Sequence, residues 1–265
     1  MAALCRPTGL IVVAFTGLYL LRTAPRHVFR YVLGGLPFAV PLLLYNTYAF
    51  GGPFAFGQDI AAEGIAQTKG LTEVWQTSAA EGFAGLLVSP SRGLFVYSPF
   101  TVFGSVGMVM AWRDPRHYAP LIPLQAVLVQ IVLAAMWFDW WGGYSYGPRP
   151  LVDVGVFLTL LMIPILARVG QANWMRGIFV TLLLYSVAVQ AIGAWAYNES
   201  GWNAKDGKNI DRPEHRSRLW AVGDSQIVHY ATHLQTERKR KQDEIYTQLC
   251  PWQIFIPSPP GKPSP

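Results

Sequence analysis

Two arginines and a group of aromatic side chains are the residues of this chain whose types and spacing best fit chemistry. Arg149 lies in the stretch WWGGYSYGPRPLVD, residues 140–153, and Arg92 lies in SPSRGLFVYSPF, residues 89–100. A guanidinium group offers a planar fork of N–H donors that suits phosphate oxygens. Aromatic rings beside it could stack on a sugar or a lipid chain. The aromatic candidates are Trp140, Trp141, Tyr144 and Tyr146.

A structural interpretation of the same residues stays open. Trp and Tyr are enriched where a membrane protein meets the water interface. Arg149 could also pair with Asp139 or Asp153, because an ionisable group near membrane depth usually faces a partner or a cavity.

Other catalytic patterns are weak or absent in the sequence. It contains neither the glycine-rich phosphate loop of nucleotide-binding proteins nor the dinucleotide fingerprint. His229 and His233 have the i, i+4 spacing of metal ligands, but no cluster of carboxylates accompanies them. Cys5 and Cys250 lie near opposite ends of the chain and have no metal-type spacing. We therefore predict no metal and no cofactor.

The composition indicates that these residues are carried by an integral membrane protein. The chain has 265 residues, of which 52% are hydrophobic and 14% charged, whereas soluble domains carry about 25% charged residues. Residues 1–198 contain 11 Lys/Arg and 7 Asp/Glu, and the much shorter segment 199–265 contains 10 and 8. We therefore expect a transmembrane domain over 1–198 and a polar tail over 199–265, disordered from about residue 256. The net charge of +6 is attributed to loop arginines, so no nucleic-acid partner is expected.

The predicted fold is all-α, a polytopic bundle of about six membrane-spanning helices. Each candidate has close to the 20 mainly apolar residues that a spanning helix needs. Prolines within these stretches are compatible with a packed, kinked bundle. The six candidates are Ala2–Leu21, Tyr31–Phe50, Gly93–Trp112, Pro120–Trp141, Leu151–Val169 and Gly177–Tyr197.

The short loops predict the orientation in the membrane. The loops RTAPRHVFR, RDPRH and RVGQANWMR carry seven arginines and would share one side if all six helices cross. Short basic loops remain in the cytoplasm. The loop 51–92, the 140–153 stretch and the tail would then lie outside the inner membrane of a bacterium.

Amphipathic helices are expected in the outer loop and in the tail. Leu71, Val74, Trp75 and Ser78 have helical spacing, and a short interfacial helix is expected over 83–87, ended by Pro90. In the tail, a further helix is expected from Asp224, with the run RKRK, residues 238–241, on a solvated face.

A family resemblance rests on several of these segments in their order. GLLVSPSRGLFVYSPF, followed by WWGGYSYGPRPLVD, is similar to segments of the bacterial C-type glycosyltransferases, the superfamily of the protein mannosyltransferases and the aminoarabinose transferase. CRPTGLIVV, YNTYAFGGPFAFGQ and the tail segment WNAKDGKNIDRPEHRSRLWAVGDSQI are similar to parts of the same proteins. The resemblance covers roughly residues 4–228.

The resemblance implies a membrane glycosyltransferase that passes a sugar from a polyprenyl-phosphate carrier to an acceptor outside the membrane. By position, Arg149 and Arg92 would hold the carrier's phosphate, and the four aromatic residues would orient the sugar or the lipid. The family's catalytic carboxylates belong to an earlier outer loop, so the chain resembles the C-terminal half of such an enzyme. The acidic residues of loop 51–92 are not assigned that role: they are Asp59, Glu63, Glu73 and Glu81.

A different class of function remains open. The chain could be a non-enzymatic membrane protein, structural or transporter-like, that binds lipids through its aromatic residues. A permease is expected to carry charged residues within its spans. The predicted spans contain only the uncharged polar residues Gln125 and Gln130 at such positions.

Overall fold

The fold is mainly helical in the part of the chain that the computed structural model describes, residues 9–57, 60, 64, 74–199 and 201–249. No strand occurs among these residues. The expectations on residues 2–8, on 71–73 and on disorder from 256 lie outside them. The main helices are α2 (Gly9–Thr23), α3 (Val28–Phe50), α5 (Ala79–Val88), α6 (Leu94–Tyr97), α7 (Val102–Arg113), α8 (Val127–Met136), α9 (Val152–Leu160), α10 (Ile163–Gln171), α11 (Asn173–Ala196), α12 (Gln226–Thr232) and α13 (Leu234–Leu249).

Three helices among the described residues are long and apolar enough to cross a membrane. They cover Pro25–Phe50, Ala119–Met136 and Asn173–Ala196. A fourth crossing results if Arg149–Leu160 and Ile163–Gln171, which meet at a bend of 58°, form one broken span. The prediction of an all-helical fold with several helices apolar enough to span a membrane is confirmed, but that of about six spans is not.

Of the two remaining expected spans, the first lies only partly within the described residues, and the third is shorter than the sequence suggests. The described part of the first is α2, which has 15 residues. The third is divided, because Ser98 leaves helical geometry with φ −140° and ψ 62° and Pro99 starts a new turn. The helix after this turn is α7, with 12 residues. An α-helix rises 1.5 Å per residue, so α7 covers only about 18 Å.

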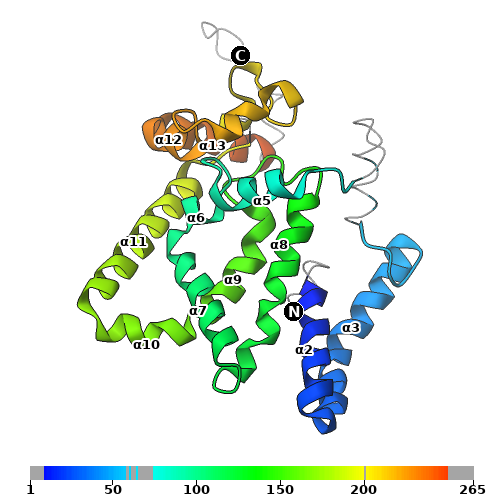
Figure 1. The fold of residues 1–265 in the computed structure, drawn as a ribbon. Helices are drawn as coiled ribbons and strands as arrows, with labels where there is room; N and C mark the ends of the chain where they lie inside the picture. The colour runs from blue at the N-terminus through cyan, green and yellow to red at the C-terminus, as the bar shows by residue number, and fades with distance from the viewer. Residues whose placement is uncertain (1–8, 58–59, 61–63, 65–73, 200, 250–265) are drawn as a thin grey trace, which may run out of the picture.

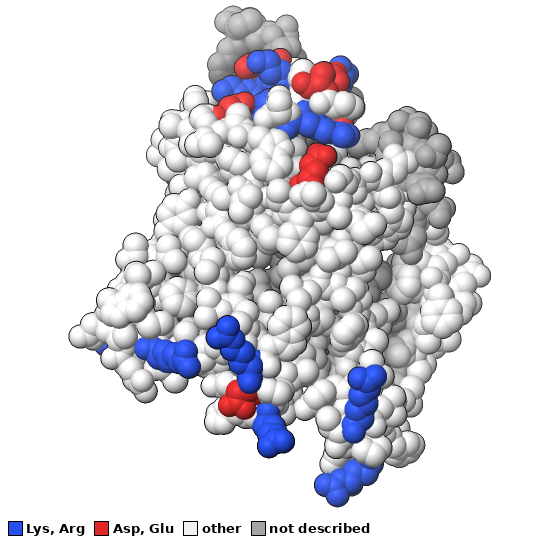
Figure 2. Space-filling view, in the orientation of Figure 1, with Lys and Arg blue, Asp and Glu red and all other residues white. Residues whose placement is uncertain are grey.

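The arginine-bearing turns gather at one end of the bundle. The turns between α2 and α3, after α7, and between α10 and α11 all lie at its lower end in Figure 1. Figure 2 shows Lys and Arg at this end and a second group of charges at the opposite end, with a wide uncharged band between them. The helical bundle therefore has the apolar middle and polar ends of a membrane domain.

Glycines permit the closest helix crossings. A methyl group at Gly82 of α5 would overlap the carbonyl oxygen of Ala135 in α8. Gly104 and Gly107 of α7 approach the backbone of α9 and its C-terminal end in the same way. Small residues at helix contacts let backbones approach closely in membrane proteins, and here they hold α5, α7, α8 and α9 together.

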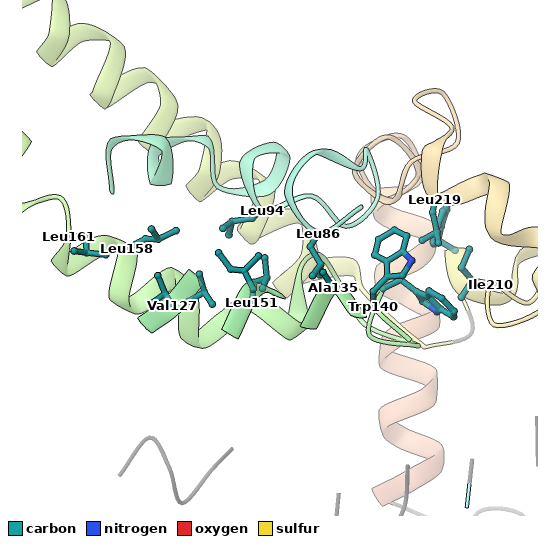
Figure 3. Close-up of a cluster of buried hydrophobic side chains, with 14 of the residues drawn as sticks. Leu86, Leu94, Val127, Ala135, Trp140, Leu151, Leu158, Leu161, Ile210 and Leu219 are labelled. Atoms are coloured by element: carbon teal, nitrogen blue, oxygen red, sulfur yellow. The ribbon is translucent and has the colours of Figure 1, made fainter. Parts of the chain in front are cut away.

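The C-terminal residues 201–249 form a cap over one end of the bundle (Figure 1). The cap contains two 3₁₀ segments, Trp202–Gly207 and Pro213–Trp220, followed by α12 and α13. The larger of two hydrophobic core clusters runs from the bundle into it. Figure 3 shows Trp140 between Ala135 on the bundle side and Ile210 and Leu219 of the cap.

Two local expectations differ from the structure. Residues 74–78 are not helical: the Val74 carbonyl accepts a hydrogen bond from the Phe138 amide at 2.9 Å, so this segment runs along the end of α8. The tail helix begins at Gln226, after Ser225 accepts from the Val228 amide as its N-cap, and it breaks at His233. The short helix expected around 83–87 is present as α5 and ends before Pro90.

Candidate functional site

Arg92 occupies a closed pocket beneath the cap. Its side chain is fully buried. Its Nε donates to the Trp141 carbonyl at 2.8 Å and its Nη1 to the Ser91 carbonyl at 3.0 Å. Its Nη2 donates to the Gly143 carbonyl at 3.1 Å and to the Asn203 side-chain oxygen at 3.0 Å. One cation thereby joins three chain segments through neutral acceptors.

The charge of Arg92 is kept in spite of its burial. Burial lowers the pKa of Arg92, and Tyr97 and Asp139 act in the opposite direction. A guanidinium remains protonated at physiological pH. The side chain also lies 5.5 Å from the centre of the Trp202 ring, a cation–π distance. Arg92 therefore links buried segments of the protein through its hydrogen bonds, and its N–H donors point into the interior.

Trp140 and Trp141 are also buried, with exposures of 2% and 1%. Trp140 packs against the Gly85 position of α5 and against Trp220 of the cap. Trp141 donates from its indole to the Asp211 carboxylate at 3.0 Å, and Arg216 lies 4.4 Å from its ring centre. Both rings are therefore occupied by protein contacts in this structure.

Tyr144 and Tyr146 keep part of their surface accessible. Tyr146 donates to the Val189 carbonyl at 2.9 Å, and its ring fits against Gly193 of α11, where a methyl group would overlap it. Its edge-to-face neighbours are Tyr97 and Tyr230. Tyr146 therefore belongs to a tyrosine cluster between the bundle and the cap, and Tyr144 packs at the margin of the same core.

Arg149 differs from Arg92 in its surroundings. It is exposed and begins the 3₁₀ turn Arg149–Leu151, which leads directly into α9. The backbone amides of Arg149 and Leu151 donate to the carbonyls of Gly147 and Pro148, so the guanidinium of Arg149 is the group that could receive an anion there. The two arginines expected to act together thus lie on the same end of the bundle, one exposed and one buried.

The chain matches no protein-family model, no curated protein and no solved structure. A functional assignment therefore depends on the residues described above and on the expectation drawn from the sequence segments.

Gln226 is a central site residue that the sequence did not indicate. Its side-chain oxygen accepts from the Tyr97 hydroxyl at 3.1 Å and from the Gly147 amide at 3.2 Å. Its side-chain nitrogen donates to the Ser145 carbonyl at 2.9 Å. These partners are separated from it by 79 to 129 positions, so no local pattern could reveal it.

A second polar cluster joins the cap to the end of α11. Glu237 is only 2% exposed; it accepts from Asn198 at 2.7 Å and from Arg240 at 3.0 Å, and it contacts the His229 ring nitrogen at 3.2 Å. His229 stacks on His233 at a centroid distance of 4.9 Å. Within the described residues, no group of three or more His, Cys, Asp and Glu is placed to hold a metal ion. The buried carboxylate thus has an amide, an imidazole and a guanidinium as partners.

Acidification is expected to loosen the cap at this cluster. Burial lowers the pKa of His229, although Glu237 opposes the shift. The pKa of His229 in the folded chain lies below the ordinary value of 6.5. The unfolded cap therefore binds more protons than the folded cap at acidic pH. The stabilisation from neutral His229 is complete above pH 6.5 and is lost as the pH falls further. Hydrogen exchange of α12 and α13, corrected for intrinsic rates, should accelerate between about pH 7.5 and pH 5. His229→Asn should flatten this dependence and His215→Asn should keep it; equal protection of the native chain at both pH values would contradict the prediction.

Proposed function

We propose that the chain is the carrier-binding part of a membrane glycosyltransferase of the C type. It would hold the phosphate of a polyprenyl-phosphate sugar during transfer to an acceptor outside a bacterial inner membrane. The observation that carries the proposal is Arg149, an exposed cation at the start of a helix and at the end of an apolar bundle. An exposed guanidinium provides charge and directed N–H donors for a phosphate.

The proposed orientation rests on the arginine-bearing turns. Short basic loops face the cytoplasm, which puts the aromatic loop between α8 and α9 and the cap on the outer side. This is the side on which a sugar carried by a lipid phosphate would be used. The phosphate of such a carrier lies at the membrane surface, the level at which Arg149 is expected.

The two arginines have different roles in this proposal. Arg149 contacts the phosphate and stabilises its charge as the glycosidic bond breaks. Arg92 is a positioning residue: by binding the carbonyls of Trp141 and Gly143 it fixes the aromatic loop from below. Tyr144 and Tyr146, whose rings are partly accessible, line the loop next to the expected carrier. No catalytic carboxylate is assigned within the described residues.

An apolar cavity of about 90 Å³ offers a place for a short part of the lipid chain. It lies among α5, α6, α7, α8 and α9, and its lining is almost entirely aliphatic and aromatic. Binding of a lipid segment there would be favoured by the hydrophobic effect, which contributes about 25 cal/mol to the binding free energy per Å² of apolar surface removed from water. The main lining residues are Phe83, Leu87, Leu94, Met108, Val127 and Leu158.

Neutralising Arg149 is expected to weaken carrier binding by about tenfold or more, because charge-assisted hydrogen bonds contribute about 1.5–3 kcal/mol. The test measures binding of an undecaprenyl-type polyprenyl phosphate to the full chain in nanodiscs, for the native protein and Arg149→Gln. Arg116→Gln, at the opposite end of the bundle, is the matched control and should bind as the native chain does. The corresponding polyprenol, which lacks phosphate, should not distinguish the variants. If Arg149→Gln and the native chain bind the polyprenyl phosphate with equal affinity, Arg149 is not the phosphate-binding residue.

A non-enzymatic lipid-binding membrane protein is the second candidate. It is favoured by α3, in whose most apolar window no residue is buried, and by the burial of Trp140 and Trp141. Competition separates the two candidates: a carrier site should prefer polyprenyl phosphate to phosphatidylglycerol, whereas a general lipid surface should not.

A further inference from the structure

The basic run of α13 lies against the end of a membrane-spanning helix. Arg238 is placed 4.3 Å from the centre of the Trp195 ring, and Lys241 donates to the Ala194 carbonyl at 2.6 Å. Both partners belong to the last turn of α11, which ends at Ala196. Since α11 is apolar enough to cross a membrane, its last turn is expected at the boundary between lipid and water.

Trp195 supports this placement independently. Its side chain is 53% exposed although it is large and apolar, as is common for tryptophans at the headgroup level. A guanidinium over such a ring remains at the same depth. Arg238 and Lys241 are spaced i, i+3, so they share one face of α13, and that face adjoins the lipid-facing surface of α11.

The direction of α13 also fits a helix on a membrane surface. Figure 1 places α13 at the capped end of α11. In Figure 3, α13 is the pale red helix, and it runs across the axis of α8 and not along it. Helices that lie in the interface present basic side chains to the headgroups. The chain thereby holds four consecutive cations, residues 238–241, at the level where lipid phosphates lie.

The nearby acidic residues offset part of this charge. Glu237 is buried and already engaged by Asn198, His229 and Arg240. Asp243 and Glu244 follow on the same helix, so three acidic side chains oppose the four cations and a small net positive charge remains. Lys239 is exposed.

We propose that α13 is a binding surface for the headgroups of anionic phospholipids in the bilayer around α11. Electrostatic attraction to the negative lipid surface would hold the cap in place, in addition to the contacts within the protein. This surface is separate from Arg149 and requires only that α11 crosses the bilayer, so it stands whether or not the chain takes part in sugar transfer.

The test compares hydrogen exchange of α13 in the full chain in two kinds of nanodisc, phosphatidylcholine alone and phosphatidylcholine with one quarter phosphatidylglycerol. We expect α13 to exchange at least fivefold more slowly in the anionic discs and this difference to shrink in high salt, because such attraction is screened. Exchange of α11 should be the same in both and reports that the bundle remains folded. Equal protection of α13 in the two discs would overturn the proposal.

Charge variants separate attraction to lipid from a structural role of the same side chains. Each basic residue near an anionic surface contributes about fivefold to binding. Lys239→Gln should therefore remove most of the extra protection, and Lys239→Gln with Lys241→Gln should remove all of it. The single variant should exchange as the native chain does in neutral discs. Replacing both lysines with arginine should preserve the extra protection. Lys208→Gln with Arg212→Gln, which removes two exposed cations elsewhere in the cap, should also leave it intact.

Two further outcomes identify the source of the anion. Millimolar inorganic phosphate added to the neutral discs should give no protection, because no single enclosed anion site is proposed. Protection by phosphate equal to that of the anionic discs would contradict a headgroup surface. The lysine-to-glutamine variants could also exchange faster in neutral discs while the ratio of exchange rates between neutral and anionic discs stays as in the native chain. That result would contradict the proposal, because these lysines would then have only a structural role.

Discussion

Arg92→Met is expected to destabilise the folded chain by about 3–5 kcal/mol. The methionine fills much of the space but donates no hydrogen bond. Three carbonyl oxygens and the Asn203 side-chain oxygen would lose a charged donor. The Ser91 carbonyl would still accept from the Tyr97 hydroxyl, and the Asn203 oxygen from the Gln226 side chain. Thermal unfolding in detergent, followed by tryptophan fluorescence, measures the change, because several of the tryptophans lie in the affected core.

The control for this variant is Arg149→Gln, which removes the same charge from an exposed position. Its stability should remain within about 0.5 kcal/mol of the native chain. Arg92→Lys should recover only part of the loss, since an ammonium donates from one atom and cannot reach acceptors on three sides. If Arg92→Met were as stable as the native chain, the cost of burying the guanidinium would equal or exceed the benefit of its bonds.

Gly107→Ala should destabilise the bundle even though alanine is the better helix former. A methyl group at this position would overlap the carbonyl oxygen of Leu161 at the end of α9. Backbone atoms cannot rotate out of the way, so α7 and α9 must separate, at a cost of about 1–3 kcal/mol or more. The unfolding midpoint and the exchange of α9 are the measurements.

Gly155→Ala is the matched control, since it lies on α9 with open space around it. There the helix preference acts alone, and the substitution should stabilise the chain by about 0.5–1 kcal/mol. The two identical substitutions are therefore expected to have effects of opposite sign. A stabilising Gly107→Ala would show that the crossing can widen freely.

The class of protein was predictable because it depends on composition and on apolar runs. Few charges and long hydrophobic stretches are typical of a helical membrane protein. The number of spans was less predictable. Ser98 and Pro99 divide one apolar run, and a bend of 58° divides another. An apolar run in the sequence shows that a segment is hydrophobic, but it does not show where the helix bends, because bends depend on the neighbouring helices.

The candidate site was predictable in its residue types but not in its burial. Arg92 and Trp140 have the chemistry expected of a binding site, yet both are enclosed by segments from the cap. The Asn203 acceptor lies 111 positions after Arg92, and no pattern near either residue shows that they meet. The composition change near Asn198 also suggested a separate tail, whereas the apolar residues Trp202, Ile210 and Leu219 continue the core of the bundle.

The distance along the chain between Arg92 and Asn203 sets an order of events during synthesis. At about 5–20 residues per second, the 111 intervening positions take roughly 6–22 seconds to be made. During this interval Arg92 has been made while one of its acceptors has not yet been translated. A nascent chain would therefore carry a cation that lacks one of its acceptors, for which chaperones or a membrane protease could compete until the cap closes.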